Sequence, residues 1–310
     1  MDSPLPETPP TFGLLVPCRN GAPFLSRLFA SARAQTRAFD EIWLFDDGSD
    51  DGSGALAGQS GARVLRSDRT VGPSAARNRL IAACGCRWLH FHDVDDIMDP
   101  RYLERVAAHT APGVEVVVCN MVWLNEGTGG VDNRWTYDAA ALARDPVSYL
   151  VRNTVGGING LYRREALLAV GGFDESLRYW EDLDLNLRLS RRTRPAVVPE
   201  ELVTAFRRRA SYSNANLGEV WRVKLHLMAR LLADATPAAR TTLAAEAEAV
   251  AGRLAALGCW RDVPAALALA RRAGGNPPTT RHPGLRLLKR IVPAATAFRL
   301  QWALHRILAR

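Results

Sequence analysis

Short apolar runs that alternate with segments of helical character between residues 12 and 120 constrain the fold of this chain most strongly. Runs of this length, bounded by polar or Gly-containing turns, are typical of buried strands. They occupy 12–18, 41–46, 62–66, 87–93 and 114–120. Because a helix between two strands lets both run in the same direction, the order predicts βαβ units. We therefore expect an α/β fold with a mostly parallel central sheet and helices on both faces.

The composition changes near residue 213. Beyond it the chain is rich in Ala, Leu and Arg and shows no strand pattern, which predicts a helical C-terminal subdomain. Residues 201–310 contain 18 Lys and Arg against 6 Asp and Glu, whereas residues 1–200 contain 22 against 26. The first residues are Pro-rich and predicted to be disordered. The predicted division is 1–11, an α/β domain at 12–213 and a basic helical region at 214–310.

The cysteines and the apolar segments indicate where in the cell the protein is expected. The five cysteines are odd in number and lie mostly in apolar segments, so we expect reduced, buried side chains rather than a disulfide framework. Cys84 and Cys86 lack the spacing of a zinc knuckle. No run reaches the ~20 apolar residues that a membrane span needs, and the N-terminus lacks a basic stretch. These features predict a cytoplasmic protein, and no motif supports a nucleic-acid partner.

An acidic loop, "DDGSDDG" at 46–52, follows one of the predicted strands directly. Its spacing partly matches a calcium-binding EF-hand loop, but Gly58 stands where that loop needs a bidentate Glu, which excludes an EF-hand. We expect Asp50 and Asp51 to serve turn formation and the capping of the next helix.

A second carboxylate cluster, Asp93, Asp95 and Asp96, ends the strand predicted at 87–93. Carboxylates of this kind suit Mg²⁺ or Mn²⁺ held together with substrate phosphates. The alternative is a solvated acidic loop that caps the following helix. Because ligands bind beyond the carboxyl ends of parallel strands, we expect both acidic clusters to face one crevice. His90 and His92 are interpreted as core or strand-edge residues rather than metal ligands.

Four segments, in order, resemble the family 2 glycosyltransferases of GT-A fold, and the resemblance covers about residues 12–213. The segments are "LLVPCRNGAPFLSRLFASARAQT", "EIWLFDDGSDDG", "GPSAARNRLIAACGCRWLHFHDVDD" and "GGFDESLRYWEDLDLNLRL". The second is close to the family's "DDGSTDG", and the third ends on its Asp-x-Asp strand. The resemblance implies a catalytic domain that uses a nucleotide-sugar.

The first two segments are implied to bind the nucleotide. By resemblance, Asp47 accepts a hydrogen bond from the uracil N3–H of a UDP-sugar. Pro17 and its neighbours, including Arg19, line the site of the base. Asp46 is expected to fix the loop beside the nucleotide.

The resemblance also implies a metal site. Asp95 is the expected direct ligand of Mn²⁺ or Mg²⁺, Asp93 approaches the ribose or the metal's water molecules, and Asp96 supports them. Arg77 and Asn78 are expected near the diphosphate or the ribose. For Arg77 an equally weighted alternative is a simple ion pair with Asp93 or Asp96.

Glu181 and Asp182 are implied to carry the proton transfer. Asp182 is the expected general base for an acceptor hydroxyl, and Glu181 orients the base or the acceptor. The alternative is that both acids only stabilise the start of a helix. A single base without a second nucleophilic carboxylate implies direct displacement with inversion.

The chain departs from the family pattern after this helix. Arg209 stands where a His that helps to hold the metal or diphosphate is usual. An arginine cannot ligate a metal, but it can bind phosphate bidentately.

The processive-synthase motif is absent, which favours transfer of one sugar to a glycan or a lipid-linked acceptor. Two alternatives are a sugar-phosphate nucleotidyltransferase and a catalytically degenerate binding protein. Residues 281–310 hold seven Lys and Arg and no acid, beside a leucine stripe. This tail either lies on an anionic membrane surface, at the inner membrane face, or packs on the catalytic domain.

Overall fold

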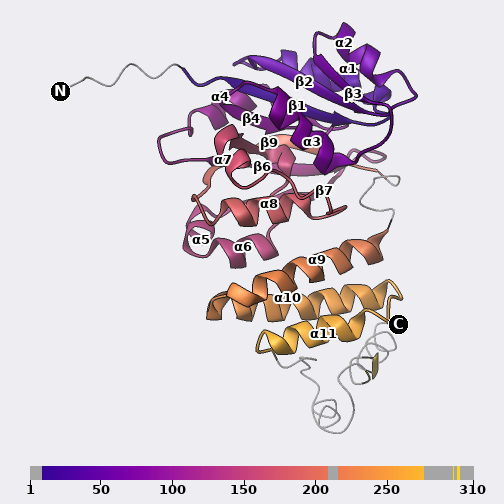
Figure 1. The fold of residues 1–310 in the computed structure, drawn as a ribbon, viewed down its shortest axis with the longest axis vertical. Coiled ribbons are helices and arrows are strands. Elements are labelled where there is room, and N and C mark those ends of the chain that lie inside the picture. The colour runs from indigo at the N-terminus through magenta and orange to yellow at the C-terminus, as the bar shows by residue number, and fades with distance from the viewer. Residues whose placement is uncertain (1–8, 209–215, 276–295, 297–298, 301–310) are drawn as a thin grey trace, which may run out of the picture. The chain divides into compact units, whose positions relative to one another are not determined.

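The structure is a computed structural model that describes residues 9–208, 216–275, 296, 299 and 300. The chain is divided into two compact units (Figure 1). The first comprises Met1–Pro146 and Asn153–Arg209, and the second comprises Val147–Arg152 and Ala210–Arg310. Segment 147–152 thus belongs to the second unit, although it lies inside the range predicted as the α/β domain. The functional boundaries 12–213 and 214–310 stay a prediction, and residues 1–8 lie outside the described residues.

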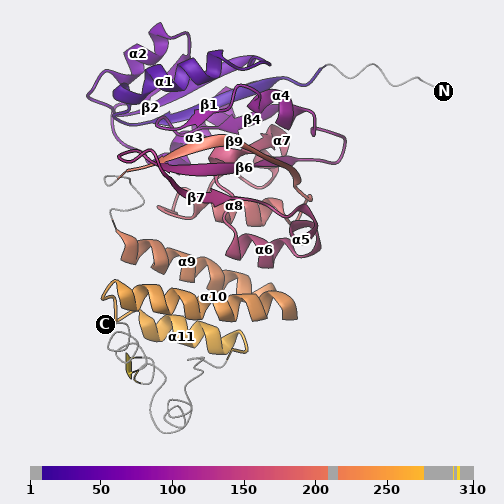
Figure 2. The same ribbon diagram turned by 180° about the vertical axis from the view of Figure 1, so that it is seen from behind.

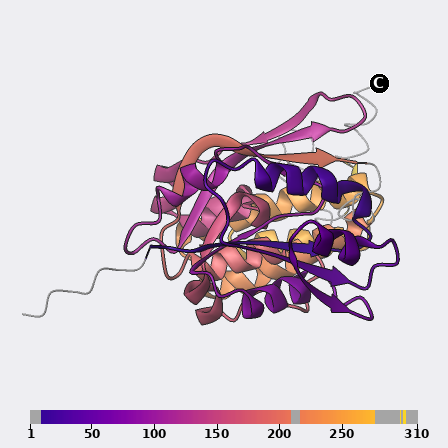
Figure 3. The same ribbon diagram turned by 90° about the horizontal axis from the view of Figure 1, so that it is seen from above.

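One nine-stranded sheet forms the centre of the first unit, with the order β3-β2-β1-β4-β8-β6-β9-β5 and β7 paired to β6. The strands are β1 (Phe12–Cys18), β2 (Glu41–Asp47), β3 (Arg63–Ser67), β4 (Trp88–Phe91), β5 (Ile97–Met98), β6 (Val116–Asn125), β7 (Val131–Trp135), β8 (Gly160–Arg163) and β9 (Ala196–Arg207). Strands β3, β2, β1 and β4 are parallel, and Figure 3 shows the indigo and violet arrows of this part from above. The α/β class with a mostly parallel core is confirmed.

The rest of the sheet is mixed. Strand β8 is antiparallel to both β4 and β6, and β5 and β7 are antiparallel to β9 and β6. Strand β9 runs parallel to β6. The sequence pattern did not predict the antiparallel strands. The direction of a strand depends on which strands pair with it, and these pairs form between residues far apart in the sequence.

Helices cover both faces of the sheet, as predicted. They are α1 (Ala22–Arg33), α2 (Ser53–Gln59), α3 (Pro73–Ala83), α4 (Tyr102–Ala107), α5 (Ala139–Arg144), α7 (Arg164–Ala169) and α8 (Glu181–Leu189), with α6 (Pro146–Arg152) at the division of the units. Helices α1 and α2 lie on one side of the sheet and α8 on the other (Figures 1 and 2).

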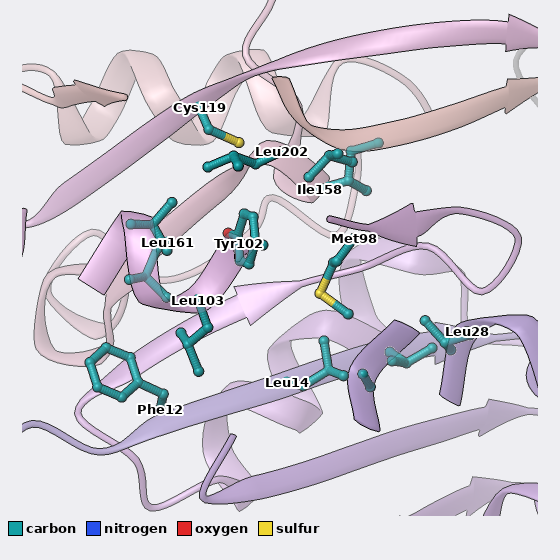
Figure 4. Packing of buried hydrophobic residues seen from close by; sticks show 14 of the residues in the cluster. Phe12, Leu14, Leu28, Met98, Tyr102, Leu103, Cys119, Ile158, Leu161 and Leu202 are labelled. Atoms are coloured by element: carbon teal, nitrogen blue, oxygen red, sulfur yellow. The ribbon is translucent and has the colours of Figure 1, made fainter. Parts of the chain in front are cut away.

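The main core lies between the sheet and the helices on the α1 side. Alternate residues of β1 point into it, because successive side chains of a strand face opposite ways. Figure 4 shows Leu14 of β1, Leu28 of α1 and Tyr102 of α4 within this core, and all three are fully buried. Burying aliphatic and aromatic side chains of this size contributes roughly 1.5–3 kcal/mol each. The core thereby fixes the parallel strands whose ends carry the acidic clusters.

The second unit is helical, which confirms the predicted character of this region. It contains α9 (Leu217–Leu231), α10 (Pro237–Ala256) and α11 (Val263–Arg272), with Leu225, Val250 and Leu267 in a separate core. No helix among the described residues is long and apolar enough to cross a membrane. Most of the tail at 281–310 lies outside the described residues, so the two interpretations of it stay predictions.

Candidate active site

The candidate active site lies at the carboxyl edge of the parallel strands. Strands β1 and β2 pair in register to their ends, where Cys18 lies opposite Asp46. Strand β4 is parallel to β1 and ends at Phe91, two residues before Asp93. Because all three strands point the same way, the structure brings both acidic clusters to one edge. The sequence predicted this placement.

Asp46 is fully buried and holds its own loop. Its Oδ1 accepts the Ser49 backbone N–H at 2.9 Å, and its Oδ2 lies 3.4 Å from the Arg66 guanidinium. A Cβ added to Gly54 would lie 2.5 Å from Oδ2, so only glycine fits there without a shift. This geometry supports the loop-fixing role expected for Asp46.

Asp47 ties the end of β2 to the start of α3. Its Oδ1 and Oδ2 accept the backbone N–H groups of Val71 and Gly72 at 2.6 and 3.0 Å. A carboxylate oxygen can accept a second hydrogen bond, so a nucleobase N–H would share this carboxylate with the backbone. Pro17, opposite Phe45 in the β1–β2 register, is half-buried, and Arg19 is exposed just beyond it.

Asp51 stabilises two helix starts rather than one. Its Oδ2 accepts the backbone N–H of Ala22, the first residue of α1. Its Oδ1 accepts the backbone N–H of Ser53, the first residue of α2, whose N-cap is Gly52 at φ +84°. Negative charge at a helix N-terminus is favourable. The expectation of a structural role for this acid agrees with these contacts.

Arg77 joins the two acidic motifs. It projects from α3 and is only 4% exposed. Its Nη1 donates to Glu181 Oε1 at 2.8 Å, and its Nη2 donates to Asp93 Oδ1 at 3.1 Å. Burial alone would lower the pKa of Arg77, but the charges of Asp182, Asp93 and Glu181 outweigh that effect and raise it. The ion pair with Asp93, which was the alternative interpretation, is therefore present, and the pair with Glu181 was not expected.

Asn78 makes structural contacts to a distant motif. Its side-chain amide donates to the Phe173 carbonyl at 2.9 Å and to Glu175 at 2.8 Å, while its Oδ1 accepts the Phe173 N–H at 2.8 Å. A Cβ on Gly172 would lie 2.4 Å from Asn78 Oδ1, and Gly172 has φ +69°. The "ARN" segment thus fixes the "GGFDE" segment, which positions the start of α8. Contact with a nucleotide was the role expected for Asn78 from the sequence.

Asp182 has a carboxyl group whose pKa lies near neutral pH. It is the second residue of α8, and its Oδ1 is buried beside the backbone of Gly157, whose hydrogen bond partly offsets the rise in pKa. Burial and then the negative charge of Glu181 raise its pKa from 3.8 to about 7. A Cβ on Gly157 would lie only 3.1 Å from this oxygen. A carboxylate that titrates near neutral pH can accept a proton from a hydroxyl.

The second acidic cluster splits into structural and exposed members. Asp96 is 5% exposed, and its Oδ1 accepts the Phe206 N–H of β9 at 2.9 Å. The Asp93 and Asp95 side chains are 42% and 34% exposed. Burial and the charge of Asp93 raise the pKa of Asp95, although Arg208 opposes them. Two neighbouring carboxylates of this kind are ligands that suit a hard divalent cation.

These residues fit a metal that is completed by a substrate. In the part of the chain that the structure describes, Asp93 and Asp95 do not belong to a group of three closely spaced ligand residues. Mg²⁺ and Mn²⁺ need no such group, because one or two carboxylates and the substrate phosphates suffice. Asp95 and Asp93 would hold the ion.

Arg208 is a site residue that the sequence analysis missed. Its guanidinium forms ion pairs with Asp95 and Glu126 and lies 4.2 Å over the Phe24 ring. Its neighbour Arg207 lies 3.5 Å from Asp132 instead. The run of three arginines was visible in the sequence, but only the structure shows that Arg208 rather than Arg207 contacts Asp95. Arg209, the expected phosphate ligand, lies outside the described residues.

The two strand histidines are core residues, as interpreted from the sequence. His90 Nδ1 lies 2.9 Å from the Gly160 carbonyl and 2.7 Å from the Tyr102 hydroxyl, and His90 Nε2 lies 3.1 Å from His92 Nδ1. Burial lowers the pKa of both, that of His92 to about 4. They are neutral at physiological pH.

Comparison with known proteins identifies the family. Glycosyl transferase family 2 matches residues 14–171, which is half of the chain, so the chain belongs to this family. It is 32% identical over 187 residues to the pre-mycofactocin glycosyltransferase of Mycobacterium tuberculosis. The match covers 57% of this chain and 38% of that protein. It is 29% identical over 200 residues to the succinoglycan biosynthesis protein ExoO of Rhizobium meliloti, covering 59% of this chain and 56% of ExoO.

Solved structures show the same fold. S. aureus TarS in complex with UDP-GlcNAc matches with a TM-score of 0.59 at 18% identity and covers 85% of this chain and 88% of its own. The mannosyltransferase PcManGT of Pyrobaculum calidifontis, in complex with GDP-Man and Mn²⁺, matches with a TM-score of 0.59 at 19% identity. That match covers 97% of this chain and 82% of the mannosyltransferase. The GT-A fold is thereby confirmed.

Proposed function

We propose that this chain transfers a single sugar from a UDP-sugar to a hydroxyl of a glycan or lipid-linked acceptor, with inversion at the anomeric carbon. The observation that carries the proposal is the Asp182 carboxyl at the start of α8, whose pKa of about 7 suits a base, next to Glu181, which Arg77 links to Asp93. Family membership supports sugar transfer as the reaction. Among proteins of the same fold, TarS binds UDP-GlcNAc and PcManGT binds GDP-Man with Mn²⁺.

The donor occupies the carboxyl edge of β1, β2 and β4 in this proposal. Asp47 accepts the N3–H of the base while it keeps the backbone contacts to Val71 and Gly72. Pro17 and Arg19 line the same edge. Arg77 is a positioning residue, because its two terminal nitrogens already bind Glu181 and Asp93.

The acceptor is activated by Asp182. Its Oδ1 takes the proton of the acceptor hydroxyl while that oxygen forms a bond to the anomeric carbon. The bond from the anomeric carbon to the diphosphate breaks, and its electron pair leaves with the UDP. Glu181, held by Arg77, adds negative charge beside Asp182 and keeps its pKa high enough to accept the proton.

A metal ion would be held by Asp95 and Asp93, as proposed from the exposed carboxylates of these two residues. When bound, such an ion neutralises the charge that develops on the departing diphosphate. The chain's own contribution is a loop fixed by Asp96 to β9 and flanked by Arg208. Arg208, which also pairs with Glu126, would exchange its contact with the Asp95 carboxylate for one with the diphosphate when the donor is bound.

The test is a panel of nucleotide-sugars assayed for release of the nucleoside diphosphate, with and without Mn²⁺. We expect release from UDP-sugars with Mn²⁺, loss of it in Asp182→Asn, and its retention in Asp184→Asn. Asp184 is a matched control, because it lies on the same helix but pairs with Arg188. Release of GDP from GDP-sugars alone would overturn the choice of UDP. Release that Asp182→Asn leaves unchanged would overturn the assignment of the base.

A further inference from the structure

A second group of potential metal ligands lies at the opposite edge of the sheet. Glu41 is the first residue of β2 and lies opposite Gly13 of β1 in the strand register. Cys84 follows the last residue of α3, and Cys86 lies two residues before Trp88, the first residue of β4. These positions are at the amino ends of the parallel strands, whereas Asp47 and Asp93 are at the carboxyl ends. The group is therefore separate from the candidate active site.

The three side chains converge closely enough to share one ion. The Sγ atoms of Cys84 and Cys86 and a carboxylate oxygen of Glu41 all lie within 4.8 Å of one another. Zinc binds thiolate sulfur at about 2.3 Å and carboxylate oxygen at about 2.0–2.2 Å, so a tetrahedral ion brings two sulfurs to roughly 3.8 Å. Closing the group around an ion needs shifts of about 1 Å or less, which small side-chain rotations supply.

The surrounding residues leave room for this arrangement. A Cβ added to Gly13 would lie 2.5 Å from Cys84 Sγ, so a side chain at that position would displace the sulfur. The two cysteines are 0% and 2% exposed, which protects the thiols from bulk solvent. The Glu41 side chain is 20% exposed and provides the contact with water through which an ion can enter.

Glu41 is also oriented by partners of its own. Its Oε2 accepts the indole N–H of Trp43 at 2.6 Å and lies 3.1 Å from Arg63. Its Oε1 lies 3.6 Å from the place where a Cβ on Gly85 would be, so this second oxygen faces the Cys-Gly-Cys turn. In metal sites, one oxygen of a ligating carboxylate is usually hydrogen-bonded, which fixes the direction of the oxygen that binds the metal. Here Oε2 is the hydrogen-bonded oxygen and Oε1 is the one that faces the turn.

We propose that Cys84, Cys86 and Glu41 bind a thiophilic divalent cation of the Zn²⁺ class, with water at the fourth position. Two thiolates select such an ion over Mg²⁺ or Mn²⁺, while the carboxylates Asp93 and Asp95 select the reverse. The ion links the turn between α3 and β4 to the start of β2. Cys-x-Cys alone lacks a zinc-knuckle spacing, and the third ligand comes from a distant strand.

The test uses the reduced, metal-free full-length protein titrated with Co²⁺. A cobalt ion bound by thiolates gives an intense near-ultraviolet charge-transfer absorption, which a site made only of oxygen ligands does not give. We expect this absorption to saturate at about one equivalent of Co²⁺ and to disappear when Zn²⁺ is added. Asp95→Asn should leave it unchanged, so the result does not depend on the proposed sugar transfer.

Variants identify the ligands. Cys84→Ser and Cys86→Ser should each abolish the thiolate absorption, whereas Cys259→Ser, a change in the other unit, should retain it. Glu41→Gln should weaken Co²⁺ binding by about tenfold or more. Arg63→Gln is its matched control, because it removes the ion pair but leaves the carboxylate.

Glu41 is partly exposed, so Glu41→Gln keeps the proposal testable if the cysteine variants fail to fold, as judged by circular dichroism. Absence of thiolate absorption in the reduced wild-type protein would overturn the proposal. Equal absorption in Cys84→Ser, or equal affinity in Glu41→Gln, would overturn it as well.

Discussion

Replacing Asp182 by Asn should lower the turnover of the enzyme and raise the stability of its fold. Asn is nearly the same size as Asp but cannot accept the acceptor's proton, so turnover should fall by ~10²–10⁴. The affinity for UDP should change little, because Asp182 is assigned to the acceptor. The same substitution removes a carboxylate whose charged form the fold disfavours, so it should also stabilise the protein without ligands.

The stability effect has a defined pH dependence. The pKa of Asp182 is raised from 3.8 to about 7, first by burial and then by Glu181. A raised pKa means that the contribution to stability is fully present below the unfolded pKa and is lost as pH rises through 7. Three pKa units correspond to at most about 4 kcal/mol. Because the residue is partly exposed and water screens its charge, we expect about 1–2 kcal/mol at pH 8.

The assay compares melting temperatures of the wild type and the variant at pH 5 and pH 8. For a unit of this size the Asn variant should melt about 2–8 °C higher at pH 8 and gain much less at pH 5. Asp184→Asn loses the ion pair with Arg188 and should be destabilised instead. In the wild type, kcat/KM should rise with pH and level off above about 7. A variant that melts at the same temperature as the wild type at pH 8, with a flat pH profile of activity, would refute the reasoning.

The remaining predictions concern the metal, the space beside the base, a structural amide and the tail. Asp95→Asn or chelation should abolish transfer and weaken UDP binding together, and full activity in EDTA would exclude the metal. Gly157→Ala places a Cβ 3.1 Å from the base oxygen, so turnover should fall by about tenfold with little change in melting temperature; unchanged turnover would contradict this. Asn78→Ala should cost about 1–3 kcal/mol of stability, measured by denaturant unfolding, because it leaves the backbone groups of Phe173 unpaired. Truncation before Arg281 should release the protein from anionic liposomes and preserve UDP-sugar hydrolysis; full-length protein that ignores such liposomes at low salt would refute membrane binding.

Local sequence determined which elements form and which motifs they carry. The apolar run at 41–46 becomes β2 because its side chains fit a buried parallel strand, and the acids that follow it can only lie at the strand's end. The Ala- and Leu-rich composition after residue 213 becomes a helical unit with its own core. The sequence also predicted Asp182 as the general base, by resemblance to the family, and this assignment stays a prediction.

Only the tertiary structure decided which side chains meet. Arg77 binds Glu181, 104 residues away, and Asn78 binds Phe173, 95 residues away; no local pattern encodes such pairs, because they depend on how strands and helices pack. The contact of Arg208 rather than Arg207 with Asp95 depends on the direction in which each side chain leaves the end of β9. The convergence of Glu41 with Cys84 and Cys86 depends on the parallel pairing of β1 with β2 and β4. Burial then sets the chemistry, since the same Asp that titrates near 4 in water titrates near 7 beside Glu181 in the folded protein.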